Sequence, residues 1–263
     1  MPYRVDLPHT GDHILDRLVA LGALDVECDQ TRMAALMPDS VAPEQITRAL
    51  GIDAISVSPA VARDDGSVWV LGPRSLRIGH LQIVPAHGAA ESGALRLIDG
   101  AAFGTGLHPT TALCLEALQD SIPNIRPHAL LDVGTGSGIL ALAGLMMGVP
   151  RALGIDIDDE ALRVAAENAR INALEARLEL ACGGPDIVPG MWPLVVANVL
   201  AAPLIQMAPA LVRRVGRNGH LLLSGIPTSV EPDVDRVYKR AGMRRVCKRS
   251  RAGWVALEFQ ATW

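Results

Sequence analysis

The segment from residue 130 to residue 138 constrains the fold of this chain more than any other. It reads Leu-Leu-Asp-Val-Gly-Thr-Gly-Ser-Gly, an apolar run that carries Asp132 and ends in three alternating glycines. This pattern predicts a buried strand and then a sharp turn, because glycine permits the positive φ angles and the close backbone approach that such a turn needs. The apolar residues 139–147 predict a helix whose first N–H groups face the crevice beyond the strand.

A second strand is expected over residues 152–155, and it ends in Asp156. A carboxylate about 20 residues after a glycine turn is placed to accept hydrogen bonds from a ribose. The glycine spacing differs from the G-x-G-x-x-G of dinucleotide sites, and Asp132 would repel a pyrophosphate but suits an ammonium or sulfonium group. S-adenosylmethionine carries both of these charges and no phosphate. The two segments therefore favour a nucleoside site over an unliganded strand-turn-helix.

Composition limits the classes of protein to consider. The chain has 263 residues, of which 49% are hydrophobic and 20% charged, so a packed core is expected. A net charge of −4 argues against a nucleic-acid partner, and the basic cluster at residues 244–251 is explained at least as well by a solvated strand edge. Histidines and cysteines lack metal-ligand spacing, so no metal is expected. No signal segment and no run of roughly 18 apolar residues is present, which predicts a soluble, cytoplasmic protein without membrane contact.

The chain is expected to contain two domains. Residues 1–60 predict a small α+β domain in the order strand, helix, two strands, helix, strand, as in a ferredoxin-like half-sandwich. Signals weaken over residues 61–100, which we interpret as a connector. Over residues 101–263 strands alternate with helices, including one helix over 203–215, and a hairpin over 244–259 closes the pattern. This part predicts a mostly parallel, doubly wound sheet with a terminal antiparallel strand.

Two further segments are expected at the edge of this sheet, because ligands bind outside the carboxyl ends of parallel strands. Asn198 follows an apolar run and stands at the mouth of a strand, where an asparagine can also serve only as a helix N-cap. Phe103, Thr105 and His108 belong to the run Phe-Gly-Thr-Gly-Leu-His-Pro-Thr-Thr, which ends at Thr111. Its hydroxyls and first-turn amides are expected to close over a cofactor, although a histidine alone is more typical of capping or packing.

Five segments together resemble the PrmA family, the bacterial methyltransferases of large-subunit ribosomal protein eleven. In the order and spacing of that family they are 103–111, 131–140, 154–158, 197–204 and 223–226. The resemblance implies a Rossmann-like class I methyltransferase fold, S-adenosylmethionine as cofactor, and transfer of methyl groups to lysine side chains, with the N-terminal α-amine as a further target. It also implies that the small N-terminal domain binds the ribosomal protein.

The resemblance places Thr111, Gly134, Asp156 and Asn198 at the family's cofactor contacts. Further cofactor-binding residues are expected from the motifs in which they lie: Phe103, Thr105, His108, Asp132 and Gly136.

Asn198 is also the expected catalytic residue. A lysine amine has a pKa of about 10.4 in water and must enter neutral, so we expect the Asn198 side-chain oxygen to accept its hydrogen bonds and aim its lone pair at the methyl group. Other readings remain open: a different protein substrate, a small molecule, a nucleic-acid base, or a cofactor-binding module without activity. Base methyltransferases place Asn-Pro-Pro-aromatic here to stack on a flipped base, whereas this chain continues Val-Leu-Ala. A small-molecule enzyme would keep its activity without residues 1–60.

Overall fold

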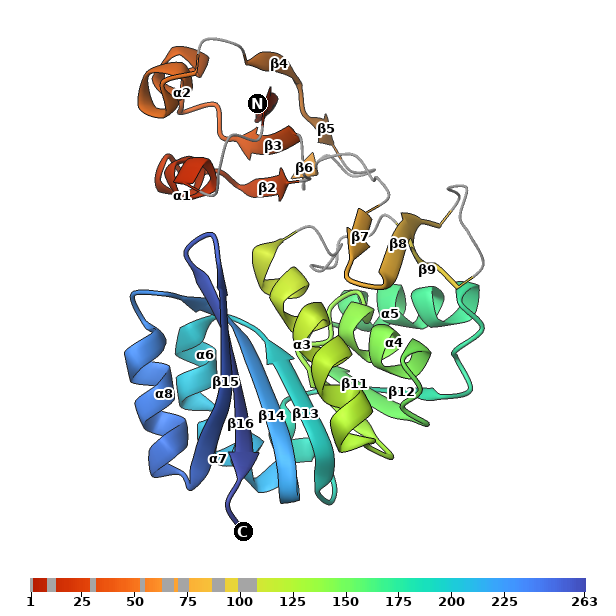
Figure 1. Cartoon of the computed structure of the whole chain (residues 1–263). Coiled ribbons are helices and arrows are strands. Elements are labelled where there is room, and N and C mark those ends of the chain that lie inside the picture. The colour runs from red at the N-terminus through yellow and green to blue at the C-terminus, as the bar shows by residue number, and fades with distance from the viewer. Residues whose placement is uncertain are drawn as a thin grey trace. The chain divides into compact units, whose positions relative to one another are not determined.

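The structure is a computed structural model that describes residues 2–8, 13–28, 32–52, 55–62, 69–70, 76–86, 93–98 and 108–263. The chain divides into two compact units, Met1–Arg74 and Ser75–Trp263. Figure 1 shows the elements of both units along the chain. Within the described ranges, no helix combines the length and the apolar character needed to cross a bilayer.

The first unit contains a four-stranded sheet with two helices. Its elements are β1 (Tyr3–Pro8), α1 (His13–Ala20), β2 (Asp25–Cys28), β3 (Arg32–Met37), α2 (Pro43–Leu50) and β4 (Ser56–Pro59), followed by the short pair β5 (Val61–Ala62) and β6 (Trp69–Val70). The strands of the sheet lie in the order β2-β3-β1-β4, and each neighbouring pair is antiparallel. Ala34 and Leu36 of β3 cluster with Ala60, and the alternating Met33, Ala35 and Met37 are also buried, so both faces of this central strand are covered.

The second unit is built on a seven-stranded mixed sheet in the order β12-β11-β10-β13-β14-β16-β15. The first five of these strands are mutually parallel, whereas β16 is antiparallel to both of its neighbours. The strands are β10 (Leu130–Val133), β11 (Ala152–Asp156), β12 (Leu178–Cys182), β13 (Trp192–Asn198), β14 (Val215–Pro227), β15 (Met243–Arg251) and β16 (Trp254–Ala261). The predicted mostly parallel sheet with an antiparallel addition is confirmed, and its strand order reverses between β10 and β13.

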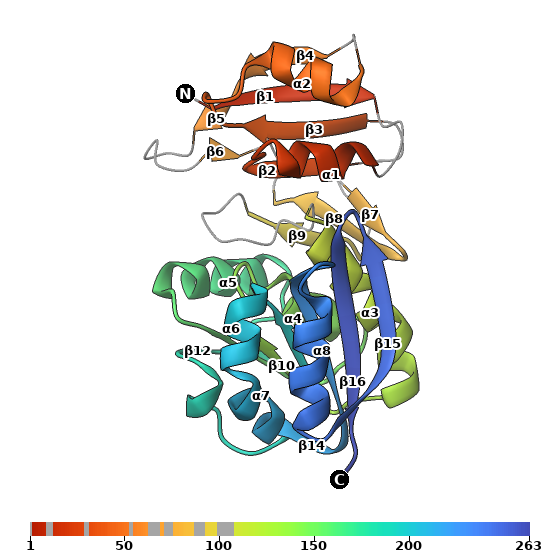
Figure 2. The same ribbon diagram turned by 90° about the vertical axis from the view of Figure 1, so that its left-hand side faces the viewer.

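Helices cover both faces of this sheet, as Figures 1 and 2 show. One face carries α3 (Pro109–Ile125), α4 (Ile139–Met146) and α5 (Asp159–Ile171), and the other carries α6 (Ala201–Gln206), α7 (Ala208–Arg214) and α8 (Glu231–Arg240). Successive strand residues alternate between the two cores, so that Leu130 and Leu194 belong to the first and Leu131 and Val195 to the second. Apart from Asp132 in β10, the central strands are therefore apolar along their buried length, as expected for a sheet that is buried on both faces.

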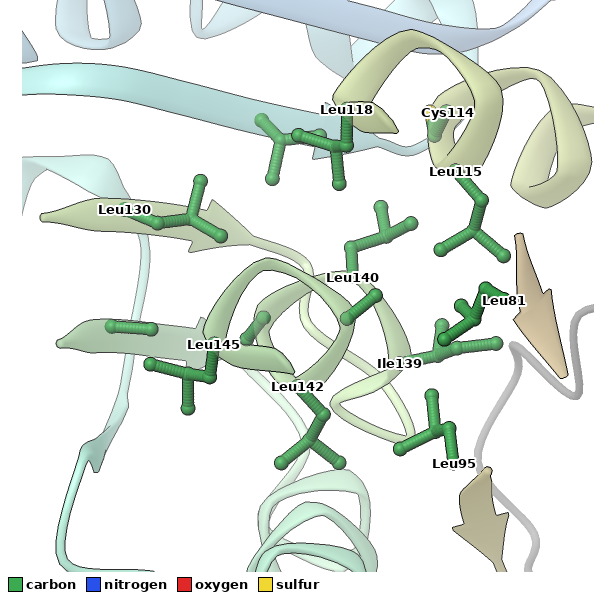
Figure 3. Packing of buried hydrophobic residues seen from close by; sticks show 14 of the residues in the cluster. Leu81, Leu95, Cys114, Leu115, Leu118, Leu130, Ile139, Leu140, Leu142 and Leu145 are labelled. Atoms are coloured by element: carbon green, nitrogen blue, oxygen red, sulfur yellow. The ribbon is translucent and has the colours of Figure 1, made fainter. Parts of the chain in front are cut away.

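Part of the expected connector instead belongs to the second unit. The strands β7 (Leu76–Ile78), β8 (Leu81–Pro85) and β9 (Leu95–Leu97) form a small sheet that contacts α3, α4 and α5. Figure 3 shows Leu81 and Leu95 packed in one cluster with Ile139 and Leu142 of α4. Strands of three to five residues carry too little periodicity for the sequence alone to assign them to either unit.

Two asparagines, Asn168 on α5 and Asn172 at its C-cap, attach β9 to the second unit. Asn172 accepts a hydrogen bond from the N–H of Arg96 (2.8 Å) and donates one to its carbonyl (2.6 Å). Asn168, which is fully buried, accepts from the N–H of Ile98 (2.8 Å) and donates to the carbonyl of Ser137 in the glycine turn (2.8 Å). The small sheet is thus bonded to α5 and, through it, to the turn after β10.

The prediction of a single helix over residues 203–215 is wrong. Two helices occur there, α6 and α7, and they meet at Met207. Pro209 lies in the first turn of α7, where the missing N–H costs nothing, but a proline inside a continuous helix would remove a hydrogen bond and clash with a preceding carbonyl.

The basic residues near the C-terminus lie on the edge strand β15, and acidic side chains of α3 and α8 neutralise most of them. The ion pairs are Arg245–Glu231, Lys248–Glu231, Arg249–Asp120 and Arg251–Glu116. This pairing fits a solvated strand edge and leaves little positive charge for a nucleic acid.

Candidate active site

A cavity of about 680 Å³ opens at the carboxyl ends of the parallel strands in the second unit. It lies where the strand order reverses, the position at which α/β sheets bind their ligands. Its size falls in the range of roughly 300–1,000 Å³ that is typical of small-molecule sites. Five of the predicted site residues line it: His108, Gly134, Gly136, Asp156 and Asn198.

The turn after β10 brings backbone rather than side chains to the cavity. Gly134 and Gly136 have φ angles of 71° and 54°, a region that favours glycine. A Cβ at Gly134 would overlap Cγ1 of Val199, so the segment after β13 packs directly on this turn. Gly134 is therefore required both by the backbone conformation and by the close approach of a second segment, and Gly136 by its backbone conformation.

Asp156 ends β11 and is held from two sides by backbone N–H groups. Its Oδ2 accepts from Gly136 (2.9 Å) and its Oδ1 from Asp158 (3.1 Å). A carboxylate oxygen has more than one lone-pair site, so each can accept a further hydrogen bond. The spacing of 20 residues between Gly136 and Asp156 thus corresponds to a direct contact between the turn and the carboxylate.

Asn198 stands at the end of β13 with its amide fixed on one side only. Its Nδ2 donates to the hydroxyl of Thr111 (3.3 Å), whereas its Oδ1 is buried and has no hydrogen-bond partner among the residues that the structure describes. Buried polar atoms are nearly always paired, so an unpaired acceptor in a cavity wall indicates a site for a ligand donor. Asn198 is not the N-cap of α6, which is Leu200.

Thr111, an expected cofactor contact, is not among the described residues that line the cavity. Its side chain is fully buried in the first turn of α3, and its hydroxyl contacts Asn198 instead. Phe103 and Thr105, which were also expected in the site, lie outside the described residues.

Asp132, whose carboxylate is expected to face a cationic cofactor group, is not among the described residues that line the cavity. The side chain is fully buried, and its Oδ2 accepts from the hydroxyl of Thr135 (2.8 Å) and the N–H of Ala141 (3.1 Å). Asp132 therefore joins the glycine turn to the beginning of α4. Burial raises the pKa of Asp132 to about 7, and the nearby Asp156 carboxylate adds to the rise.

We expect this buried carboxyl to make the fold less stable as pH rises. Its folded pKa of about 7 exceeds its ordinary value of 3.8, so the folded chain binds more protons than the unfolded chain between these values. Its contribution to the free energy of unfolding therefore falls from about pH 4 to about pH 7. Asp132→Asn removes this titration and can keep both hydrogen bonds through its amide oxygen.

The test is urea denaturation of wild type and Asp132→Asn at about pH 5 and about pH 8. Between the two pH values, the stability of the wild type should fall relative to that of the variant. A difference independent of pH would show that Asp132 is ionised throughout.

His108 lines the cavity and caps α3. Its Nδ1 faces the backbone N–H of Thr110 (3.3 Å) and the hydroxyl of the same residue (2.8 Å). The imidazole makes an edge-to-face contact with Trp254, with ring centroids 5.0 Å apart at an angle of 71°. Burial lowers the pKa of His108 to about 4, so the ring is neutral at physiological pH.

Three parts of the cavity wall were not foreseen from the sequence. They are Gly183–Pro185 after β12, Met207 between α6 and α7, and Trp254 at the start of β16. The first follows a parallel strand and so could have been found by the rule that identified Asp156 and Asn198. Trp254 reaches the same edge only because β16 runs antiparallel, and Met207 only because the expected helix is broken.

The comparisons with known proteins agree with this geometry. The family described as ribosomal protein L11 methyltransferase (PrmA) matches residues 63–262. A ribosomal protein L11 methyltransferase of Geobacter sulfurreducens is 40% identical over 82% of this chain and 76% of its own length. One of Chromohalobacter salexigens is 37% identical over 87% of this chain and 74% of its own length.

A solved structure supports the same relationship. The ribosomal protein L11 methylase of Lactobacillus delbrueckii subsp. bulgaricus has a TM-score of 0.67 and 29% identity, covering 72% of this chain and 100% of that structure. The resemblance seen in the motifs is thereby confirmed, and the second unit has the Rossmann-like fold of class I methyltransferases. The chain belongs to the ribosomal protein L11 methyltransferase (PrmA) family.

Proposed function

We propose that this protein transfers methyl groups from S-adenosylmethionine to amines of ribosomal protein L11, with lysine side chains as the principal acceptors. The observation that carries this proposal is the buried, unpaired Oδ1 of Asn198 in a cavity that also presents the glycine turn and Asp156. The names of its relatives supply the protein substrate. A base methyltransferase is disfavoured because no aromatic side chain follows Asn198 within its segment.

The residues present fit the cofactor. Asp156 would accept hydrogen bonds from the two ribose hydroxyls, and Gly134 and Gly136 would let the methionine portion lie against backbone. Ile157, whose exposed fraction is 83%, offers an apolar surface beside Asp156 for the adenine. When bound, S-adenosylmethionine supplies an electrophilic methyl group on a sulfonium that leaves readily.

The chain itself must hold a neutral amine in line with that methyl group. Among the described residues that line the cavity none is a lysine or arginine, and Val199, Leu200 and Met207 make this end apolar. Desolvation here disfavours the charged ammonium and so lowers the pKa of the entering lysine. The Oδ1 of Asn198 then accepts an amine N–H and fixes the direction of the lone pair, a positioning effect that can contribute several kcal/mol.

Thr111 would act through Asn198. The hydroxyl of Thr111 accepts a hydrogen bond from Nδ2 of Asn198, so Oδ1 of Asn198, on the other side of the amide, is turned away from Thr111. We expect Thr111→Val, which cannot accept this bond, to lower kcat about tenfold, a change comparable to the loss of one hydrogen bond. The dissociation constant for the cofactor should change less than threefold. Steady-state kinetics and calorimetry measure the two quantities.

Thr111→Ser keeps the hydroxyl and should restore most of the turnover. If Thr111→Val weakened cofactor binding as much as it lowered kcat, Thr111 would be a cofactor contact and not a positioning residue.

We further propose that the first unit binds the substrate protein. Its strand order and antiparallel pairing match those of a ferredoxin-like half-sandwich, a small scaffold more suited to binding than to chemistry. The family match covers residues 63–262, so this unit lies almost entirely outside the matched segment. A protein that modifies a ribosomal component is expected to work in the cytoplasm.

The test is to incubate the protein with radiolabelled S-adenosylmethionine and a mixture of ribosomal proteins, and to identify labelled residues by mass spectrometry. We expect label on lysines of ribosomal protein L11. Label confined to another protein would reject the proposed substrate, and no transfer to any of them would reject the proposed activity.

A further inference from the structure

Trp254 lines the cavity, yet the mechanism above gives it no role. It begins β16, which runs antiparallel to β14, so its end of the strand lies at the same edge as the ends of β13 and β14. In the sheet Asn198 pairs with Ser224, and Trp254 pairs with Pro227 of the same strand β14. The register alone therefore places Trp254 beyond Asn198 on the mouth side of the cavity.

A second set of contacts leads to the same placement. The indole makes its edge-to-face contact with His108, which caps α3. One turn later on this helix, Thr111 binds the amide of Asn198. The indole and the amide oxygen are thus fixed relative to each other through α3 as well as through the sheet.

The aromatic ring of Trp254 is the group at this end of the cavity best able to stabilise a cation. Its cross-strand neighbour Arg251 is paired with Glu116 (2.8 Å), and neither of these two side chains lines the cavity. Two carboxylates line the cavity within the described residues, Asp156 at the end of β11 and Asp158 just after it. β11 is two strands from β13 and so roughly 10 Å away. His108, beside the indole, is neutral because burial lowers its pKa to about 4. The π face of tryptophan binds alkylated ammonium groups more strongly than that of any other side chain.

Asn198 alone cannot hold every acceptor that successive methylation produces. A neutral primary amine offers two N–H donors to its Oδ1, a monomethyl amine one and a dimethyl amine none. In each transfer the nitrogen lone pair forms the new N–C bond, and the C–S electron pair stays with the sulfur of the departing S-adenosylhomocysteine. The ammonium product must release one proton to water before it can accept another methyl group.

We propose that the indole face of Trp254 receives the methyl-bearing nitrogen and thereby determines how many methyl groups one amine acquires. The inference rests on the function proposed above. Positive charge develops on the nitrogen in every transfer, and its attraction to the ring replaces the hydrogen bonds that methylation removes. The contribution of Trp254 should therefore grow from the first transfer to the third.

The experiment follows purified bacterial ribosomal protein L11 by intact-protein mass spectrometry, with saturating cofactor and the whole 263-residue chain as the enzyme. For Trp254→Leu we expect the first transfer to stay within about threefold of wild type and the third to slow about tenfold or more, so that mono- and dimethylated amines accumulate. Trp254→Phe keeps an aromatic face and should be intermediate. Trp263→Leu removes a tryptophan that is 40% exposed and outside the cavity, and should behave as wild type.

The outcomes separate the two proposals. If the wild type does not methylate L11, the proposed function fails. If the wild type and Trp254→Leu give the same mixture of methylated species, or if the wild type adds only one methyl group per amine, the role of Trp254 is rejected while the proposed function stands. Equal slowing of all three transfers would mean that Trp254 only supports the fold, and circular dichroism melting curves of both Trp254 variants check this directly.

Discussion

Asn198→Ala is expected to lower kcat for L11 methylation about a hundredfold, the loss that accompanies misplacement of a reacting group by about 1 Å. The variant lacks the buried Oδ1 that we assign to the amine, so the lone pair is no longer directed at the methyl group. The dissociation constant for the cofactor should rise far less than kcat falls. Steady-state kinetics of L11 methylation and calorimetry with S-adenosylhomocysteine give the two values.

The control for this variant is Asn124→Ala. Asn124 is an exposed asparagine on α3 whose Nδ2 bonds the carbonyl of Asp120, and it should have wild-type kinetics. If Asn198→Ala kept both its turnover and its cofactor affinity, Asn198 would have no part in the reaction.

Asp156→Ala is expected to raise the dissociation constant for the cofactor at least tenfold. Hydrogen bonds to a charged group contribute roughly 1.5–3 kcal/mol, and the variant loses those to both ribose hydroxyls. It also loses the acceptors of the Gly136 and Asp158 N–H groups, so the glycine turn should be held less firmly. Calorimetry with S-adenosylmethionine and with S-adenosylhomocysteine measures the effect.

Asp186→Ala is the matched control, because Asp186 is an exposed aspartate paired with Arg213 and does not line the cavity. Its affinity for the cofactor should equal that of the wild type. Unchanged affinity in Asp156→Ala would remove Asp156 from the ribose site.

The core of the candidate site could be predicted because it depends on local patterns and one rule of topology. Gly134, Asp156 and Asn198 each follow an apolar run, and parallel strands bring their carboxyl ends to one edge. The roles of Asp132 and Thr111 could not be predicted in this way. Whether a polar side chain beside a strand end faces the cavity or the wall behind it depends on packing between segments far apart in the sequence.

The same limit applies to the fold. The long strands and helices of the second unit have enough periodicity to be recognised, but β7, β8 and β9 are short and are stabilised by contacts with α3, α4 and α5. Gln119, for example, accepts from the N–H of His80 (2.7 Å) and donates to the carbonyl of Ile78 (3.0 Å) across the β7–β8 turn. Such tertiary hydrogen bonds have no local sequence signal.

The bond between Gly136 and Asp156 has a consequence for how the two ends of a nucleoside ligand are recognised. The backbone N–H of Gly136 connects the glycine turn, which would bind the amino-acid part of the ligand, to the Asp156 carboxylate, which would bind the sugar. A displacement of either subsite strains this hydrogen bond, so the two subsites are coupled and preorganised together. A ligand that lacks either the sugar or the amino-acid part should therefore meet a subsite that already has its bound conformation. The protein would then lose little conformational entropy when that ligand binds.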